Sequence, residues 1–469
     1  MPTESSGHWQ HRPGYGGPVR LLTAADAQDS AVAAATNLSH AGLSARDRLA
    51  VVTPEYASGI DVPRAQADVL GVLLGALRLG VIPVLLHPLL TEVERHFILN
   101  DAQVTTDPIL PEQLAAWTRP APGSPAELSE FPLTRPMHYT SGTTGPPKGV
   151  IAQLSEREAF QWWTDEIGHW QFDSADRTLV HSPLCHSAPL RFAIGTLLAG
   201  GTVVLPGRFT VATTIAALRD AAPTTAFLVP SQAALLLAAE LPQSTYRLLA
   251  HAGSACPPEV KRGLHAWAGA DRVWEFYGST EGQFTSCRGT EWEARPGTVG
   301  RARPGRELDI DAAGLVWCTP PSFARFEYWN DPVKTAAAWR STAGGRAFTV
   351  GDLGRLDGDG YLYLEGRRED LIISGGVNVY PAEVESVIST HPLVQDVVVF
   401  AVPDSRWGQR VTCAVVTSAS ADELTEWSRQ RLAAYKLPKE WIVVETLPRN
   451  SMGKVRRSTL SRELGLTES

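Results

Sequence analysis

The sequence predicts an α/β protein: a large N-terminal body of several layers with mixed, largely parallel sheets, followed by a small α+β unit. Helical and strand-like segments alternate through most of the chain, and this alternation is typical of parallel α/β layers. After Gly360 the pattern changes to short strands and short helices. The length of 469 residues also exceeds what one compact core usually holds.

The first predicted elements lie near the N-terminal end of the body. Residues 62–80 carry apolar side chains at helical spacing and end in a glycine, which predicts a helix with a glycine stop. Residues 81–88 form a short apolar run, typical of a buried strand. Residues 91–103 follow as a second helix, and Thr91 and Glu94 have the spacing of a capping box.

The same pattern recurs in the middle of the chain. Residues 197–207 predict a helix end, a glycine turn and a strand, and residues 213–230 predict a helix followed by a strand. Residues 119–136 are rich in Pro, Ser and Ala, which predicts a surface linker. In the last hundred residues we expect strands at 361–366 and 397–403, and helices at 377–392, 421–435 and 458–466.

Composition narrows the classes of function. A net charge of −8 argues against a general nucleic-acid binder, and no apolar run is long enough to span a membrane. The first residues lack the pattern of a secretory signal. The five cysteines are scattered and form no CxxC pair, so we expect neither a disulfide framework nor a structural zinc site. These features predict a protein of the reducing cytoplasm with no nucleic-acid or membrane partner.

Lysine is rare in this chain, so a lysine inside a motif stands out. The chain has six lysines against 36 arginines. One of them, Lys148, lies in the segment MHYTSGTTGPPKGVIAQ, residues 137–153. Its glycines allow close backbone approach, and its hydroxyl and N–H groups can surround phosphate oxygens. The spacing of its glycines and lysine differs from that of the Walker A phosphate loop, GxxxxGK[ST]. The string is also too specific for an ordinary Gly/Pro turn.

The string YTSGTTGPPKGV resembles the phosphate loop of the adenylate-forming superfamily, which includes acyl-CoA synthetases, aryl-acid–CoA ligases, luciferases and peptide-synthetase adenylation domains. Other segments from about residue 45 to 460 resemble further signatures of this family in the same order. The resemblance implies phosphate contacts from Thr140, Ser141, Gly142, Thr143, Thr144, Gly145 and Lys148.

Two segments resemble the nucleotide pocket of the family. They are HAGSACPPEVKRGL, residues 251–264, and EFYGSTEG, residues 275–282. The resemblance implies that Thr280 contacts the α-phosphate and that Glu281 ligates Mg²⁺, which prefers carboxylate oxygen. It places the adenine pocket at Gly253, Ser254, Ala255, Phe276, Tyr277, Gly278 and Ser279, with Phe276 and Tyr277 flanking the ring.

Further matches divide the chain into residues 1–366, the AMP-binding and acyl-substrate domain, and residues 367–469, a small mobile cap. Residues 349–385 resemble the family segment that joins the two domains. There the resemblance implies ribose contacts from Asp352 and Arg367, a hinge at Glu369, and a border of the coenzyme A tunnel at Gly375 and Gly376. Residues 448–457 resemble the catalytic-lysine segment of the family. The resemblance makes Lys454 the candidate that stabilises the negative charge on the α-phosphate.

The acyl pocket has the weaker signature. In HSPLCHSAPLRF, residues 181–192, His186 matches the family histidine beside the acyl carboxylate. Arg191 either meets a polar end of the substrate or pairs with a surface carboxylate, and the second role is favoured. The pair Trp162 and Trp163 departs from the usual family pattern and gives the pocket its own wall. We expect Trp163, His186, Phe227 and Gly253 to surround a modest aryl or medium-chain acyl group.

The predicted function is ATP-dependent adenylation of a small carboxylic acid with release of pyrophosphate, followed by transfer to coenzyme A. ATP, Mg²⁺ and coenzyme A are the expected cofactor and substrates. Two different enzymatic roles also fit the motifs: delivery of the acyl group to a carrier protein, and a diazotase-like activation of nitrite. A non-catalytic nucleotide sensor would be a role outside enzymes, and the retained Lys454, Asp352 and Glu281 argue against it.

Overall fold

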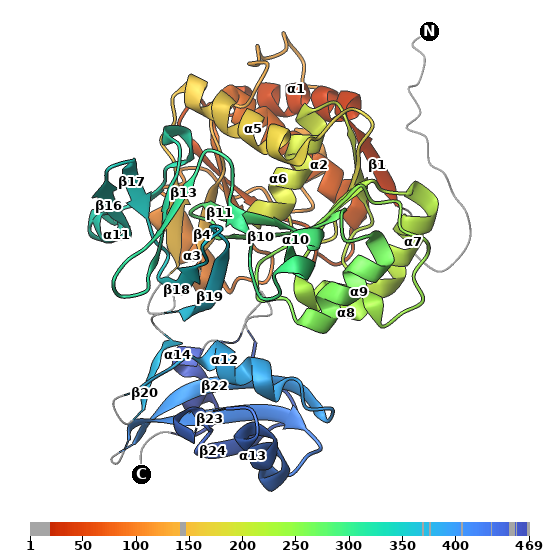
Figure 1. Ribbon diagram of the computed structural model, residues 1–469. Coiled ribbons are helices and arrows are strands. Elements are labelled where there is room, and N and C mark those ends of the chain that lie inside the picture. Colours follow the sequence, from red (N-terminus) through yellow and green to blue (C-terminus); the bar gives the residue numbers. More distant parts are fainter. Residues whose placement is uncertain are drawn as a thin grey trace. The chain divides into compact units, whose positions relative to one another are not determined.

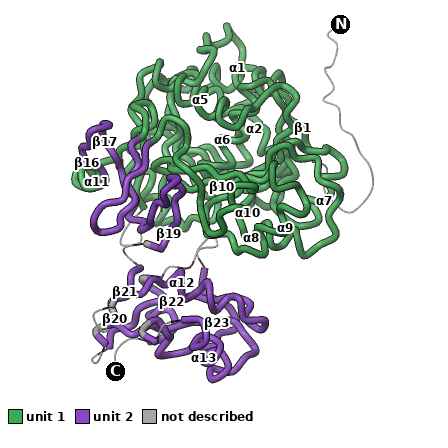
Figure 2. Tube along the Cα trace, viewed as in Figure 1, with its two compact units in different colours: residues 1–140, 147–306, 320–337 green, residues 141–146, 307–319, 338–469 purple. Residues whose placement is uncertain are grey.

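The computed structural model describes residues 19–140, 147–367, 370–374, 377–404, 407–432, 434–449, 455 and 457–466. The chain divides into two compact units (Figure 1, Figure 2). Unit 1 comprises residues 1–140, 147–306 and 320–337, and unit 2 comprises residues 141–146, 307–319 and 338–469. The domain boundary between residues 366 and 367 stays a prediction. In the described part of the chain, no helix is long and apolar enough to cross a membrane.

The larger sheet of unit 1 is built on parallel strands. Its order is β1 (Arg20–Thr23), β7 (Thr202–Leu205), β6 (Arg177–Leu179), β8 (Thr225–Leu228), β9 (Leu248–His251), β10 (Val273–Gly278), β11 (Gln283–Arg288), β12 (Arg301–Ala302). The five neighbouring strands β7, β6, β8, β9 and β10 are parallel. Strands β1, β11 and β12 pair antiparallel at the edges. The central strands β8 and β9 are buried along their whole length, as is typical of strands in a parallel sheet.

The second sheet of unit 1 is mixed. Its order is β15 (Glu327–Tyr328), β5 (Lys148–Ile151), β4 (Met137–Thr140), β3 (Ile82–Leu86), β2 (Arg48–Val52). Strands β2, β3 and β4 are parallel, and β5 and β15 add to them antiparallel. The candidate phosphate loop therefore connects two neighbouring antiparallel strands, β4 and β5.

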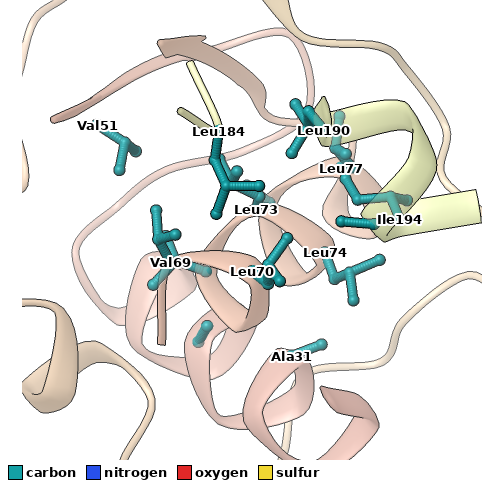
Figure 3. Packing of buried hydrophobic residues seen from close by; sticks show 14 of the residues in the cluster. Ala31, Val51, Val69, Leu70, Leu73, Leu74, Leu77, Leu184, Leu190 and Ile194 are labelled. Carbon is teal, nitrogen blue, oxygen red and sulfur yellow. The ribbon is translucent and has the colours of Figure 1, made fainter. Parts of the chain in front are cut away.

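Helices surround these sheets. They are α1 (Ala24–His40), α2 (Val62–Leu79), α3 (Glu92–Asp101), α4 (Leu114–Trp117), α5 (Glu156–Trp170), α6 (Ser187–Leu198), α7 (Val211–Ala221), α8 (Pro230–Leu237), α9 (Pro258–Ala268), α10 (Gly289–Ala294) and α11 (Pro332–Ala338). Helix α2 is apolar nearly all round and is buried at the centre of the main hydrophobic core. Figure 3 shows its Leu70, Leu73 and Leu77 packing with Leu190 and Ile194 of α6.

Unit 2 is α+β. One antiparallel sheet has the order β13 (Glu307–Ile310), β14 (Val316–Thr319), β17 (Gly345–Phe348), β16 (Trp339–Thr342), and β18 (Asp352–Leu356) forms a hairpin with β19 (Leu362–Arg367). The other sheet contains β21 (Val377–Val379), β20 (Ile372–Ser374), β23 (Gly408–Thr417), β22 (Val394–Asp404) and β24 (Glu440–Val443). Its helices are α12 (Pro381–Ile388), α13 (Ala421–Arg429) and α14 (Arg457–Glu463).

The structure confirms most of the predicted elements. The helix over 62–80 is α2, which ends at Gly80 in the left-handed region, and the capping box of Thr91 and Glu94 is present at α3. The prediction for 377–392 is wrong at its start, because β21 occupies the first residues and the helix begins at Pro381. A valine-rich entry before a proline favours extended backbone, which explains this difference.

Two helical glycines give a test of the packing around α2. A Cβ atom on Gly75 would lie 2.5 Å from the Ala31 carbonyl oxygen of α1, whereas a Cβ on Gly168 in α5 would meet no atom within 4 Å. Gly75→Ala should therefore lower the stability of the fold by about 1–3 kcal/mol, because backbone atoms cannot yield easily. Gly168→Ala should raise it by about 0.5–1 kcal/mol, because alanine favours helix.

The midpoints of thermal unfolding of the two variants and the parent chain check this prediction. A higher midpoint for Gly75→Ala than for the parent would contradict the close packing of α1 on α2.

Candidate active site

The segment from Glu275 to Gly282 forms the end of β10 and a tight turn into β11. The Ser279 amide donates to the Gly282 carbonyl at 2.9 Å, which closes the turn. A Cβ atom at Gly278 would lie 2.8 Å from the Gly282 carbonyl oxygen, so the turn requires a glycine there. The turn carries Thr280 and the buried Glu281.

Tyr328 brings two of the predicted site residues together. Its hydroxyl donates a hydrogen bond of 2.8 Å to the Glu281 carboxylate. The Lys148 Nζ lies 5.6 Å from the centre of the same Tyr328 ring, within the range of a cation–π contact. Because β15 pairs with β5, Tyr328 lies in register opposite Val150, close to Lys148. Sequence reasoning missed Tyr328, because nothing in FARFEYWN marks a site.

The predicted phosphate loop begins and ends at a paired position. Thr140, the last residue of β4, lies in register opposite Lys148, the first residue of β5. The pairing fixes both ends of the loop. Its central residues lie outside the described residues, namely Ser141, Gly142, Thr143, Thr144 and Gly145.

A small cavity opens beside the Thr280–Glu281 turn. About 20 Å³ of it is open to the centre of a water molecule, which is room for about one water. Helix α5 contributes Trp162 and Glu166 to its wall, and α6 contributes Ser187 and Arg191. Helices α5 and α6 pack together in unit 1 (Figure 1). The Ser279 hydroxyl, which also lines the cavity, is buried and has no hydrogen-bond partner among the described residues.

Buried charges form one wall of this cavity. The Arg303 guanidinium donates to Asp165 at 2.8 Å and to Glu166 at 3.0 Å, and it also contacts Gln283. Arg306 donates to Asp165 at 3.0 Å. Burial alone would raise the pKa of Glu166, but the charges of Arg191 and Arg303 outweigh it and lower that pKa to about 2. The carboxylate is therefore ionised near neutral pH.

The structure corrects two expectations about the acyl pocket. The partner of Arg191 is the buried Glu166, with the two charged groups 3.7 Å apart, and not a surface carboxylate. Trp163 is fully buried in the hydrophobic core and donates to the Thr134 carbonyl, whereas its neighbour Trp162 lines the cavity. Arg135, Glu166, Arg303 and Arg306 were missed, because isolated charged residues carry no motif.

His186 occupies the N-cap position of α6. Its ring centre lies 5.8 Å from that of His87, and one ligand atom each from His87, Cys185 and His186 lie within 4.8 Å of one another. His87 Nδ1, however, accepts a hydrogen bond from the Leu89 amide, so the proton of the neutral ring is on Nε2. Burial also raises the pKa of the Cys185 thiol, which keeps it protonated. This cluster is therefore poorly suited to a metal ion.

The predicted adenine residues occupy the ends of β9 and β10. Gly253, Ser254 and Ala255 follow β9, and Gly253 has a φ of 96°, in the left-handed region. Phe276 is buried in an aromatic cluster, whereas Tyr277 packs on Phe284, with ring centres 4.7 Å apart. Neighbouring strand residues point to opposite faces, so the two aromatic rings do not flank one space.

The remaining candidates belong to unit 2 or lie outside the described residues. Asp352 is buried at the start of β18, and its backbone pairs with that of Arg367 in β19. This register places both predicted ribose contacts on neighbouring strands. The candidates outside the described residues are Glu369, Gly375, Gly376 and Lys454.

Comparison with known proteins identifies the family of this chain. Residues 134–316 match the family model of the AMP-binding enzymes, and residues 383–454 match that of the AMP-binding enzyme C-terminal domain. A feruloyl-CoA synthase of Amycolatopsis is 32% identical, with 95% of this chain and 94% of that protein covered. An uncharacterised acyl-CoA ligase of Bacillus subtilis is 30% identical, with 73% and 72% covered.

Solved structures show the same relationship. The o-succinylbenzoate–CoA synthetase of Bacillus subtilis, solved in complex with ATP and magnesium, has a TM-score of 0.80 and 27% identity, with 93% of this chain and 94% of that chain covered. The chain belongs to the AMP-binding enzyme family. These relatives confirm the predicted fold and the predicted class of AMP-forming acid–CoA ligase, which uses ATP, Mg²⁺ and coenzyme A.

The lowered pKa of Glu166 gives a test of the buried charges. Its pKa is about 2 in the folded protein, below the ordinary value of 4.5, so its contribution to stability is complete above about pH 4.5 and is lost as the pH falls toward 2. Glu166→Gln should therefore lower the free energy of unfolding by about 3 kcal/mol at pH 7, because it leaves buried arginines uncompensated.

Urea unfolding at pH 7, 5, 4 and 3 measures this effect. The difference in unfolding free energy between the parent chain and Glu166→Gln should become smaller as the pH falls. The exposed Glu156→Gln in the same helix serves as the control and should change the unfolding free energy little. A difference that is constant from pH 7 to 3 would show that Glu166 is not ionised in the fold.

Proposed function

We propose that this acid–CoA ligase forms its acyl-adenylate in unit 1, beside the Thr280–Glu281 turn. The proposal rests on two contacts of Tyr328. Its hydroxyl donates to the Glu281 carboxylate, and its ring lies within cation–π range of Lys148 in the predicted phosphate loop. A phosphate group placed near Lys148 would thus lie close to the carboxylate that is the candidate ligand of Mg²⁺. Of the two predicted aromatic residues, Tyr277 is the better candidate for adenine, because Phe276 is buried in its own cluster.

The residues at this turn fit a magnesium ion. One oxygen of Glu281 accepts from Tyr328, and within the described chain the other oxygen has no hydrogen bond. Thr280 and Ser279 line the cavity beside the turn, and the buried Ser279 hydroxyl has no hydrogen-bond partner among the described residues. Oxygen donors of this kind suit Mg²⁺, and we assign the ion to Glu281. Mg²⁺ bound there would neutralise charge on the phosphate oxygens.

The reaction has two steps. In the first, a carboxylate oxygen of the acid bonds to the α-phosphorus of ATP, the bond to the β-phosphate oxygen breaks, and pyrophosphate leaves with the bonding electrons. Lys148 and Lys454 stabilise the charge on the phosphate. In the second, the sulfur of coenzyme A bonds to the acyl carbon, the bond to AMP breaks, and the thiol proton goes to solvent. Asp352 and Arg367 hold the ribose in this scheme.

The roles of the residues outside the described chain rest on sequence alone. We assign Lys454 to the first step and the segment with Gly375 and Gly376 to the second, with Glu369 as the hinge between the two arrangements. We also place the enzyme in the cytoplasm, since all five cysteines are free thiols.

The most informative experiment measures pyrophosphate release over a panel of acids, with and without coenzyme A. Acid-dependent release together with thioester formation is the expected result. Acyl-AMP that accumulates with coenzyme A present and is consumed only by a carrier protein would instead favour a carrier protein as the acceptor. If no acid gives pyrophosphate, the proposed reaction is wrong.

Glu281 and Tyr328 give a test of the magnesium assignment. Glu281→Gln should lower pyrophosphate release by about 100-fold or more, because an amide is a poorer ligand and leaves phosphate charge unbalanced. Tyr328→Phe keeps the ring near Lys148 but loses the hydrogen bond, and a decrease of about tenfold is expected. The exposed Glu259→Gln is the matched control and should retain parental activity.

Titration of Mg²⁺ separates the two effects. Glu281→Gln should require more Mg²⁺ for half-maximal activity than the parent enzyme. Unchanged activity and unchanged Mg²⁺ dependence in this variant would exclude Glu281 as the ligand.

Lys454 gives a test of the two arrangements. Lys454→Ala should lower acyl-AMP formation by about 100-fold or more, yet leave thioester formation from supplied acyl-AMP largely intact. Lys334→Ala, which removes an exposed lysine, is the control for the general effect of losing a lysine. Both half-reactions are measured separately, by pyrophosphate release and by thioester yield. Equal loss in both would contradict the assignment of Lys454 to the first step alone.

A further inference from the structure

The cavity beside the Thr280–Glu281 turn is lined by more positive than negative side chains. Among the described residues, four arginines line it, Arg135, Arg191, Arg303 and Arg306, against the three carboxylates of Asp165, Glu166 and Glu281. All four arginines are buried. Under the proposed function Glu281 is committed to Mg²⁺, so its charge is not available to them. The four arginines are then balanced by the two carboxylates of Asp165 and Glu166, which leaves two positive charges in excess.

Two of the four arginines donate hydrogen bonds to carboxylates of the fold, although the buried Nε of Arg303 has no partner among the described residues. Arg303 contacts Asp165, Glu166 and Gln283, and its second terminal nitrogen also donates to the Asp165 carbonyl at 3.0 Å. Arg306 donates to the Asp165 carboxylate and to the Pro304 carbonyl at 2.9 Å. These contacts occupy the carboxylate of Asp165 and most of the hydrogen-bond acceptor positions of Glu166. Arg303 and Arg306 are therefore structural.

Arg191 and Arg135 are less well compensated. Arg191 is 8% exposed, its distance of 3.7 Å to Glu166 is too long for a hydrogen bond, and its buried Nε has no partner in the described part of the chain. Arg135 is 7% exposed and its guanidinium lies 4.8 Å from the centre of the Trp162 ring. Burial, together with the charge of Arg191, lowers the pKa of Arg135 to about 10, which leaves it charged at neutral pH.

Leaving buried guanidinium groups short of counter-charge is costly, and a fold that needed these arginines for stability alone would close them with carboxylates. Both groups instead line a cavity that also reaches the adenylation turn. A carboxylate is the natural complement of guanidinium in charge and in hydrogen-bond geometry.

We propose that the acid activated by this enzyme carries a second carboxylate, which binds Arg191 and Arg135 while the first carboxylate is adenylated beside Thr280. The proposal rests on the proposed function and names its class of substrate. The cavity itself offers about 20 Å³ to the centre of a water molecule, which is room for little more than one water, so the terminal carboxylate alone enters it. This adds a second charge to the modest aryl or medium-chain acyl group that the sequence predicts.

Matched acids test the proposal on the parent enzyme. The pairs are hexanoate with hexanedioate and benzoate with benzene-1,3-dicarboxylate, and the monoamide of hexanedioate keeps the length without the second charge. Pyrophosphate release should have a kcat/KM at least about tenfold higher for the diacid of a pair than for its monoacid or monoamide. Equal or higher values for the monoacids would overturn the proposal.

Variants of Arg191 test whether this side chain causes the preference for diacids over monoacids. Arg191→Met retains length without charge and should abolish the preference for diacids, whereas Arg191→Lys should retain part of it. Arg219→Met, at an exposed position on α7, is the control and should leave the preference unchanged. Should Arg191→Met fail to fold, Arg191→Lys and the panel on the parent enzyme still decide the matter.

The same data distinguish the possible failures. If the anion facing Arg191 is pyrophosphate, Arg191→Met changes the KM for ATP and affects monoacids and diacids equally, which overturns the proposal. If monoacids give pyrophosphate as well as diacids do, the proposed function stands and the substrate class is wrong. If no acid gives pyrophosphate but diacids raise the unfolding temperature of the parent and not of Arg191→Met, the anion site stands and the proposed reaction fails.

Discussion

The hydrogen bond from Tyr328 to Glu281 connects the two sheets of unit 1 at the point where the chemistry is expected. Glu281 follows a strand of the larger sheet, whereas Tyr328 lies on the edge strand of the second sheet, next to the strand that begins with Lys148. A buried carboxylate needs hydrogen-bond partners, and the tyrosine supplies one without adding a second charge. Its ring meanwhile faces the ammonium group of Lys148. One side chain thus holds an anion and a cation near a common space.

The buried charges around Glu166 serve a different purpose. Arg303, which follows β12, and Gln283 of β11 both donate to Glu166 and so bring α5 close to this edge of the larger sheet, which a purely apolar wall could also do. Their arrangement leaves the guanidinium of Arg191 between Glu166 and the ring of Phe276, with capacity for one more anion. In the proposal above, the second carboxylate of the substrate supplies this anion.

Much of the fold could be predicted from the sequence, whereas the roles of the nucleotide-site residues stay predictions. Helix α2 has strong periodicity and a glycine stop, and the phosphate loop is a contiguous string whose two ends pair as neighbouring strands. Such signals are local, so sequence carries them. Tyr328, Arg135 and Arg303 could not be predicted, because they lie far apart in the chain and acquire meaning only where the sheets and helices meet. Trp162 and Trp163 were indistinguishable in sequence, and only packing shows which one lines the cavity.

We propose that the acid is activated by attack of its carboxylate on the α-phosphate of ATP in unit 1. Transfer of ¹⁸O from a labelled carboxylate measures which phosphorus is attacked. AMP should gain one labelled oxygen during thioester synthesis and pyrophosphate should gain none, because the oxygen that attacks phosphorus leaves with AMP. Label in inorganic phosphate or pyrophosphate, or AMP free of label, would exclude attack on the α-phosphorus.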